Sequence, residues 1–326
     1  MIRKHNISHP LFTRSNFVIS WFLGLDLVAF VSLIFYIMVV VVIIRHRKKY
    51  FNNSFFTLVV SMGIADIGCL IMHFGFVSPA AILGQDPLPL WYIGFWGFMW
   101  EWFNNASTTH IPFIALNRFL AVFLPTTYEK YFNKAVLVFM ILFSYLSDLA
   151  ITIAFYACSC VVNVPGLSYT VTYLPGSCGP SMIDVRKLQD VIGTTSSLIC
   201  NIGTFIKVRL ISRQVSIGAH SAQSKKEMKM LFQFSVIYAC FMITSIVYWI
   251  VEAFGDKSNI EALSRMELTH LTVFIIHSSI NPFMLLSFGS DVKTIIFGAP
   301  KKKVSKKTNV TSLVSRQTKQ ELTADP

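Results

Sequence analysis

The sequence predicts an all-α integral membrane protein: a seven-transmembrane helix bundle with its N-terminus outside and its C-terminus in the cytoplasm. Three observations lead to this fold class. Apolar residues make up 54% of the chain and charged residues only 13%, whereas a soluble domain usually carries about a quarter charged residues. Seven stretches are long and apolar enough to cross a bilayer as helices. Basic residues gather on one side of these stretches.

The seven stretches have the length of transmembrane helices, about 20 residues, and not that of the roughly ten-residue alternating strands of a membrane barrel. The fifth stretch is less apolar than the others, because it contains several Ser, Thr and Asn residues. In chain order the seven stretches are Trp21–Ile44, Phe55–Leu83, Leu90–Phe123, Ala135–Cys160, Leu188–Val208, Met230–Ile250 and Met266–Phe288. We expect an extracellular segment at 1–20, the seven-transmembrane domain at 21–288, and an interfacial helix with a basic, disordered cytoplasmic tail at 289–326. Ile295 and Ile296 of that helix should face lipid.

Lys and Arg are unevenly distributed between the two sides of the predicted bundle. Of the 28 in the sequence, 21 fall in or beside the first, third and fifth connections and in the C-terminal tail, and seven fall on the other side. The positive-inside rule places the more basic side in the cytoplasm. The N-terminus is then outside, where Asn6 in Asn6-Ile7-Ser8 is a candidate for glycosylation.

Several classes of protein do not fit the sequence. Topology accounts for the net charge of +12, so we expect no nucleic-acid partner. The apolar stretches lack hydrolase, metalloprotease and nucleotide-binding motifs, and no zinc-like cysteine pair occurs, so we expect neither an enzyme nor a metal centre. Asp148 in the fourth stretch is a lone acid with no evident catalytic partner. A channel or transporter would favour repeats or charge rings; none is evident, and that class is the alternative.

Polar and ionisable groups lie within three of the stretches, where their cost in lipid makes them indicative of function. The second stretch contains Asp66, the third ends in Asn117-Arg118-Phe119, and the seventh contains Ser278-Ser279-Ile280-Asn281-Pro282. In this order and at these depths they resemble the motifs of rhodopsin-like G-protein-coupled receptors, over Trp21 to about Phe297.

Longer strings resemble the nematode serpentine chemoreceptors of class X, the Srx type. They are Ala115-Leu116-Asn117-Arg118-Phe119-Leu120-Ala121-Val122-Phe123, Gly203-Thr204-Phe205-Ile206-Lys207-Val208-Arg209-Leu210 and Lys225-Lys226-Glu227-Met228-Lys229-Met230-Leu231-Phe232. The resemblance implies a plasma-membrane receptor of a sensory neuron cilium or dendrite. It would bind an extracellular small-molecule ligand and activate a heterotrimeric G protein.

The resemblance also implies roles for single residues. Arg118 matches the arginine of the superfamily's acid-Arg-Tyr motif. The implied residues for G-protein coupling and activation are Asn117, Arg118, Phe119, Asn281 and Pro282. The implied polar hub, or Na⁺ site near Asp66, comprises Asp66, Ser107, His277, Ser278 and Asn281.

The sequence departs from the superfamily's pattern at several positions. Asn117 replaces the usual acid, so Arg118 lacks that neighbouring partner, and Leu285 replaces the tyrosine of the Asn-Pro-x-x-Tyr motif. The first helix lacks its usual asparagine. The top of the third helix lacks the usual cysteine. A disulfide of Cys178 with Cys158 or Cys160 in the oxidising exterior is an open alternative.

One face of the third stretch is a candidate ligand-binding site. Glu101 precedes Arg118 by 17 residues, about 25 Å along a helix, and so lies near the outer surface. Its carboxylate, with aromatic neighbours, suits an amine. The candidate residues are Trp100, Glu101, Asn104, Asn105, Thr108 and His270. The alternative is an aromatic belt at the membrane interface.

The cytoplasmic side offers further partners. Six basic residues at the fifth connection suit a G protein, and they equally suit anionic inner-leaflet lipid. They are Lys207, Arg209, Arg213, Lys225, Lys226 and Lys229. Ser and Thr residues of the tail are candidate phosphorylation sites, which would allow a receptor kinase and arrestin to bind there.

Overall fold

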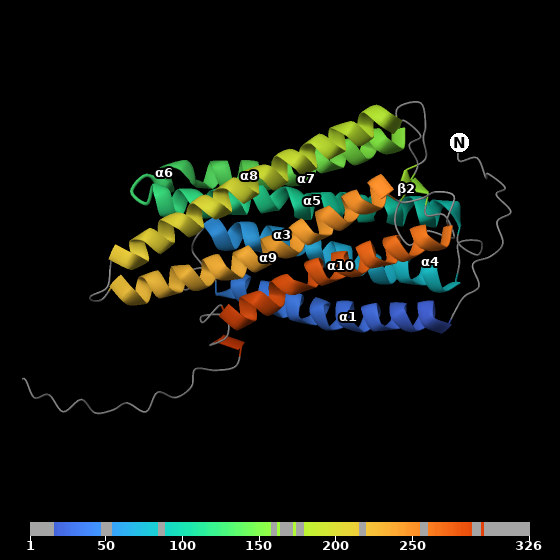
Figure 1. The fold of residues 1–326 in the computed structure, drawn as a ribbon, viewed down its shortest axis with the longest axis horizontal. Helices are drawn as coiled ribbons and strands as arrows, with labels where there is room; N and C mark the ends of the chain where they lie inside the picture. Colours follow the sequence, from blue (N-terminus) through green and yellow to red (C-terminus); the bar gives the residue numbers. More distant parts are fainter. Residues whose placement is uncertain are drawn as a thin grey trace, which may run out of the picture.

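A computed structural model describes residues 16–46, 54–83, 89–157, 162–163, 172–173, 179–214, 220–254, 260–288 and 295–296. These residues form a bundle of long helical segments that run side by side (Figure 1). Their bounds are α1 Asn16–Arg45, α3 Ser54–Met72, η1 His73–Val77, α4 Ser78–Leu83, α5 Leu90–Phe123, α6 Tyr128–Tyr131, α7 Lys134–Ala157, α8 Gly179–Gln214, α9 His220–Phe254 and α10 Ile260–Phe288. Because α3, η1 and α4 follow one another without a break, the bundle has the seven predicted spans.

The helix bounds extend beyond the apolar stretches at several ends. The fifth span, expected to begin at Leu188, begins nine residues earlier at Gly179 and continues to Gln214, and the sixth begins at His220. Helical hydrogen bonds do not need lipid, so a helix can extend past the apolar segment that hydropathy detects. The prediction was therefore wrong about these ends, and the early start of α8 places Arg186 inside a helix.

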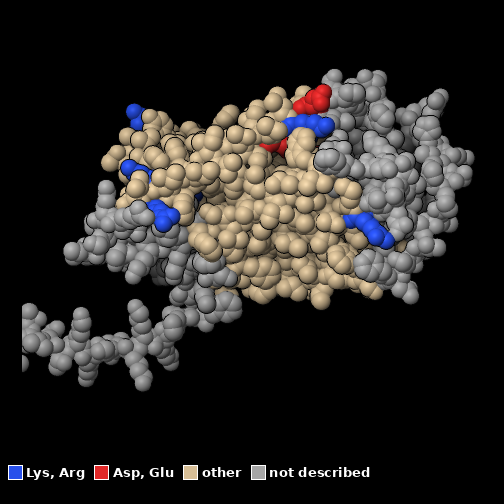
Figure 2. All heavy atoms as spheres, viewed as in Figure 1, with Lys and Arg blue, Asp and Glu red and all other residues tan. Residues whose placement is uncertain are grey.

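By length and composition, five of the described helical segments could cross a membrane, and α9 adds a shorter apolar segment at Phe234–Ile250. Helix α5 is not among the five, although the sequence predicts it as a span. It packs against α3, α7 and α8, so its polar residues are shielded from lipid by protein. The outward face of the bundle is apolar, as lipid contact requires: α1, α7 and α8 expose many large aliphatic side chains. Figure 2 shows a broad middle region without charged residues.

Buried side chains of the described residues form two apolar clusters, one toward each end of the bundle. The inner apolar cluster, at the end that we expect to be cytoplasmic, joins residues such as Phe55, Ile114 and Phe241. The outer apolar cluster, at the opposite end, joins residues such as Phe22, Trp100 and Phe274. Ile295 and Ile296 are partly buried and pack against the inner apolar cluster, so part of each side chain contacts the bundle, which the sequence did not indicate.

Two local features were not predicted. A short antiparallel strand pair, β1 Val162–Asn163 with β2 Thr172–Tyr173, lies between α7 and α8. The second span contains a π-helical turn, η1, whose first residue, His73, is fully buried. The Nε2 atom of His73 lies 3.1 Å from Oδ1 of Asp26 on α1, and the other oxygen of Asp26 accepts a hydrogen bond of 2.7 Å from Ser78. These contacts fix the second half of the second span, which we expect to be the outer half, to α1.

Candidate functional sites

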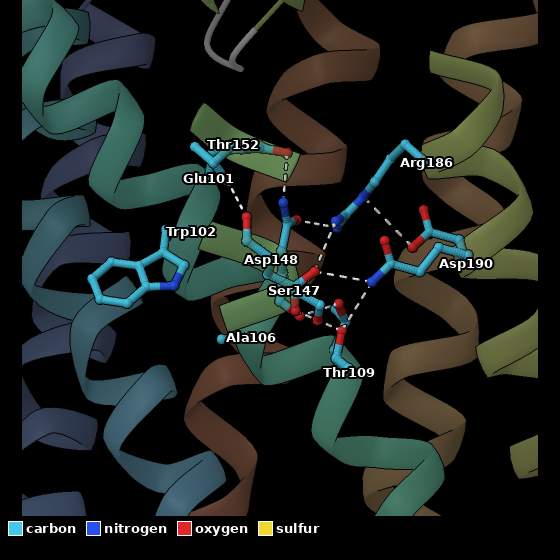
Figure 3. Close-up of polar contacts among 12 residues, drawn as sticks. Glu101, Trp102, Ala106, Thr109, Ser147, Asp148, Thr152, Arg186 and Asp190 are labelled. Atoms are coloured by element: carbon cyan, nitrogen blue, oxygen red, sulfur yellow. Dashed lines mark hydrogen bonds and ion pairs between the residues drawn. The ribbon is translucent and has the colours of Figure 1, made fainter. Parts of the chain in front are cut away.

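A buried polar cluster joins α5, α7 and α8 in the half of the bundle that we expect to be outer (Figure 3). We call it the outer cluster; it consists of Glu101, Asn105, Thr109, Asp148, Arg186, Gln189 and Asp190. Arg186 reaches inward from α8 and donates to Oδ1 of Asn105. Its Nη1 lies 3.7 Å from Oδ1 of Asp148, and its Nε lies 3.7 Å from Oδ1 of Asp190. Both distances exceed the roughly 2.8 Å of a close charge-assisted hydrogen bond.

Asp148 is the centre of this cluster and is fully buried. Thr109 of α5 donates to its Oδ2 at 2.8 Å, and Gln189 of α8 donates to its Oδ1 at 2.9 Å. Gln189 also donates to the Thr109 hydroxyl at 3.1 Å. The sequence did not indicate these hydrogen-bond partners, because Thr109 and Gln189 lie 39 and 41 positions from Asp148 in the chain, on other helices.

Two of the six predicted ligand-binding residues lie in the outer cluster. Glu101 is 5% exposed and accepts a hydrogen bond of 3.0 Å from Asn105. Asn104 is partly buried on the same helix, and Thr108 donates to the backbone oxygen of Asn105 at 2.8 Å.

Trp100 and His270, the other two predicted residues, contact different parts of the bundle. Trp100 packs on Phe274 of α10, with ring centroids 5.0 Å apart. His270 lies beside Tyr248 of α9 at 5.5 Å. Trp102 points away from the outer cluster in Figure 3 and donates to the backbone oxygen of Tyr145. Trp100 and His270 therefore lie outside the outer cluster.

A second polar site surrounds Asp66 in the middle of the bundle. One carboxylate oxygen of Asp66 accepts hydrogen bonds from Tyr36 of α1 and from Asn281 of α10, the latter at 2.8 Å. The other oxygen accepts a hydrogen bond from Ser107 of α5. Asp66 is fully buried, so four helices meet at one carboxylate. The sequence placed Ser107 and Asn281 near Asp66 correctly but missed Tyr36.

His277 and Ser278, the other members of the predicted hub, are buried on α10. The ring of His277 lies 5.7 Å from that of Phe241. Among the described residues, no group of three or more His, Cys, Asp or Glu could hold a metal ion. Asp66 and Ser107 do bring one carboxylate and one hydroxyl oxygen together, and oxygen ligands of this kind suit a hard cation.

The C-terminal end of α5, which we expect to be the inner end, contains the third site. The Nδ2 atom of Asn117 donates to the Ser54 hydroxyl at 2.9 Å and to the Tyr128 hydroxyl at 2.8 Å. These two hydroxyl oxygens lie 2.5 Å apart. Asn117 is fully buried, so its amide ties the start of α3 and the short α6 to α5.

Arg118 projects from the next position onto an aromatic ring. Its Cζ lies 3.2 Å from the ring centroid of Phe55 in α3. Phe119 stacks on Phe123 with centroids 4.2 Å apart, at the face where α8 approaches α5. The predicted coupling residue thus lies against the ring of Phe55, and its neighbour in the sequence, Asn117, is neutral.

Helix α10 supplies the remaining predicted coupling residues. Asn281 bonds Asp66, and Pro282 lies within the helix without ending it. Leu285 is buried in the inner apolar cluster, so the position of the superfamily's tyrosine is used here for packing.

Other predictions fall outside the described residues. They concern the glycosylation of Asn6, the disulfide of Cys178 with Cys158 or Cys160, and the tail. The side chains of Lys225, Lys226 and Lys229 also lie outside them.

Comparisons with known proteins agree on one type of architecture. The family model described as serpentine type 7TM GPCR chemoreceptor Srx matches residues 27–288. The crystal structure of squid rhodopsin matches with a TM-score of 0.72 at 13% identity, covering 91% of this chain and 89% of that one. At that identity the match shows the fold alone. No curated protein sequence matches the chain.

Proposed function

Because the chain belongs to the Srx family of serpentine seven-transmembrane chemoreceptors, we propose that it binds an extracellular small molecule at the outer cluster and activates a heterotrimeric G protein through the inner face around Arg118. The observation that carries this proposal is the burial of Asp148 and Glu101 beside Arg186, at the junction of three helices. Ionisable groups are costly at such a depth, and one site that joins three helices can pass a change in ligand occupancy to all of them.

The charges of the outer cluster favour a cationic ligand such as an amine. Three carboxyl side chains, those of Glu101, Asp148 and Asp190, accompany the single guanidinium of Arg186. With all four ionised, the cluster has a net negative charge, and an ammonium group would offset it. The two 3.7 Å separations of Arg186 from its acids are long enough for a ligand group to compete for the same carboxylates.

Helix α5 provides a direct connection between the two ends of the receptor. Glu101 lies in the outer cluster, Ser107 bonds Asp66, and Arg118 lies at the inner end of the same helix. An agonist would act by binding the active arrangement of this helix and its neighbours more tightly than the resting one. Small shifts of α5 would alter all three sites together.

The proposal extends to an ion, to further partners and to location. Na⁺ would bind at Asp66 and Ser107, where it competes with the donors that now satisfy the carboxylate. The more basic side, with the C-terminus, faces the cytoplasm, where anionic inner-leaflet lipid, a receptor kinase and arrestin would bind. The receptor would act in the plasma membrane of a sensory neuron cilium or dendrite.

The test is a G-protein activation assay in membranes that contain the native receptor, screened with organic cations and small-molecule extracts. A response to a cation that is lost in Arg118→Ala and in Asp148→Asn, at equal surface expression, supports both ligand binding at the outer cluster and G-protein activation through Arg118. Ser147→Ala is the matched control, because Ser147 precedes Asp148 and bonds the backbone of its own helix.

Two outcomes would contradict the proposal. A response that survives Arg118→Ala would show that the inner face does not act through this residue. A ligand-gated conductance in the same membranes, without G-protein activation, would favour the alternative of a channel or transporter.

A further inference from the structure

We propose that the ring of Phe55 holds Arg118 in the resting state and thereby takes the place of the missing acid at Asn117. This inference rests on the proposed G-protein coupling through Arg118. The guanidinium carbon lies 3.2 Å from the Phe55 centroid, so the cation sits directly over the negative face of the ring. Phe55 is 4% exposed, and cation–π attraction is strongest where the pair is withdrawn from water.

The neighbouring residue does not supply the charge that the superfamily's acid supplies. Asn117 is neutral, and its amide nitrogen donates to Ser54 and to Tyr128. An acid at this position would attract the adjacent guanidinium, but an amide cannot supply that charge. The ring of Phe55 offers a partial negative charge at a site that Arg118 can reach.

One helix end supplies both contacts. Ser54 and Phe55 are the first two residues of α3; the first accepts a hydrogen bond from Asn117 and the second lies under Arg118. The Ser54 contact sets the spacing of α3 and α5, and the Phe55 contact sets the direction of the arginine. Phe55 is therefore a positioning residue: Arg118 must leave its ring before a G protein can engage it.

The consequence is measurable without a ligand. If Phe55 stabilises the resting state, removing the ring should raise the fraction of receptor that is active without agonist. Phe55→Leu keeps an apolar side chain in the inner apolar cluster and removes the π face, and Phe55→Met is a second such variant if Leu lowers expression. Phe55→Tyr retains the face. We expect basal nucleotide exchange on the G protein to rise about tenfold in Phe55→Leu and to stay near the native level in Phe55→Tyr.

Phe56→Leu is the matched control. Phe56 adjoins Phe55, with ring centroids 5.3 Å apart, and packs against the same apolar cluster, but it is Phe55 that lies under Arg118. A purely structural effect of losing a ring near the start of α3 would raise basal exchange equally in both variants, and that result would overturn the proposal.

A second measurement separates the contact from the signalling. Unfolding of the purified receptor by sodium dodecyl sulfate is compared for Phe55→Leu, Arg118→Met and the double variant. Additive effects would mean that the two side chains are not coupled, which overturns the proposal whatever the exchange assay shows.

Coupling without a rise in basal exchange, in a receptor that does activate a G protein, also overturns the role of Phe55 but leaves the proposed function intact. If no variant activates any G protein across the main Gα classes, the proposed function fails, and the signalling role of Phe55 fails with it. The unfolding comparison of the single and double variants tells these failures apart, because it measures the coupling of Phe55 and Arg118 without any G protein.

Discussion

The hydroxyl group of Tyr36 on α1 donates a hydrogen bond to the carboxylate of Asp66 on α3, and both side chains are withdrawn from the surface, with exposures of 2% and 0%. Thirty positions separate these residues in the chain. The superfamily's usual asparagine is absent from this first helix, and a tyrosine supplies the donor instead. The central polar site of the receptor therefore uses a residue that no motif indicates.

Tyr36→Phe should destabilise the bundle by about 1–3 kcal/mol, because the buried carboxylate of Asp66 loses one of its donors. Unfolding of the purified receptor by sodium dodecyl sulfate measures the change. Tyr131→Phe makes the same chemical change at a side chain that is 53% exposed and should have almost no effect. Equal effects in the two variants would show that the Tyr36 hydroxyl does not matter.

Gly68→Ala should destabilise the receptor by about 1–3 kcal/mol through overpacking. A Cβ at this position would lie 2.5 Å from Cγ of Phe103, so α3 and α5 would have to separate, whereas at Gly24 no atom lies within 4 Å. Gly24→Ala on α1 is the control and should be neutral or slightly stabilising. The same unfolding assay compares the stability of the two variants. A Gly68→Ala variant as stable as the native receptor would mean that α3 and α5 are not so closely packed.

Removing either charge of the Asp148–Arg186 pair should cost more than removing both. Asp148→Asn leaves Arg186 near the other acids, and Arg186→Gln leaves a fully buried carboxylate without its cation. Breaking a buried pair typically costs about 3–5 kcal/mol, with less expected here because the atoms are 3.7 Å apart. We expect the double variant to be more stable than the sum of the two single losses predicts. Strict additivity would show that the two charges do not interact.

Asn117→Asp should lower basal G-protein activation by supplying the acid that the sequence lacks. The change is nearly isosteric, and the hydroxyls of Ser54 and Tyr128 can donate to a carboxylate as well as accept from an amide. The new charge would hold Arg118 in its resting position. Asn133→Asp, the same change at an exposed helix start, is the control. An increase in basal exchange on Asn117→Asp would contradict this account of the inner site.

If Na⁺ binds the folded receptor at Asp66, the stabilisation should grow with the logarithm of the Na⁺ concentration once this exceeds the dissociation constant. Thermal unfolding in NaCl is compared with that in an equal concentration of choline chloride, and about 2.7 kcal/mol is expected at 100 times the dissociation constant. Asp66→Asn should abolish the difference. A stabilisation by Na⁺ that persists in Asp66→Asn would place the ion elsewhere.

The sequence by itself determined the number and order of the spans, because apolar length is a local property that lipid imposes on each helix separately. It also gave the approximate depth of Asp66, Arg118 and Asn281 in the membrane, because each residue of a helix adds a fixed rise along the helix axis. It did not determine where helices end in water, so α8 was expected to begin after Arg186 rather than before it.

Only the tertiary structure decided which side chains meet. The partners of Asp148, the donor from Tyr36 and the ring beneath Arg118 each come from another helix. These contacts depend on how each helix is rotated and tilted against its neighbours. Such angles follow from the packing of the whole interior, which the spacing of residues along one helix does not contain.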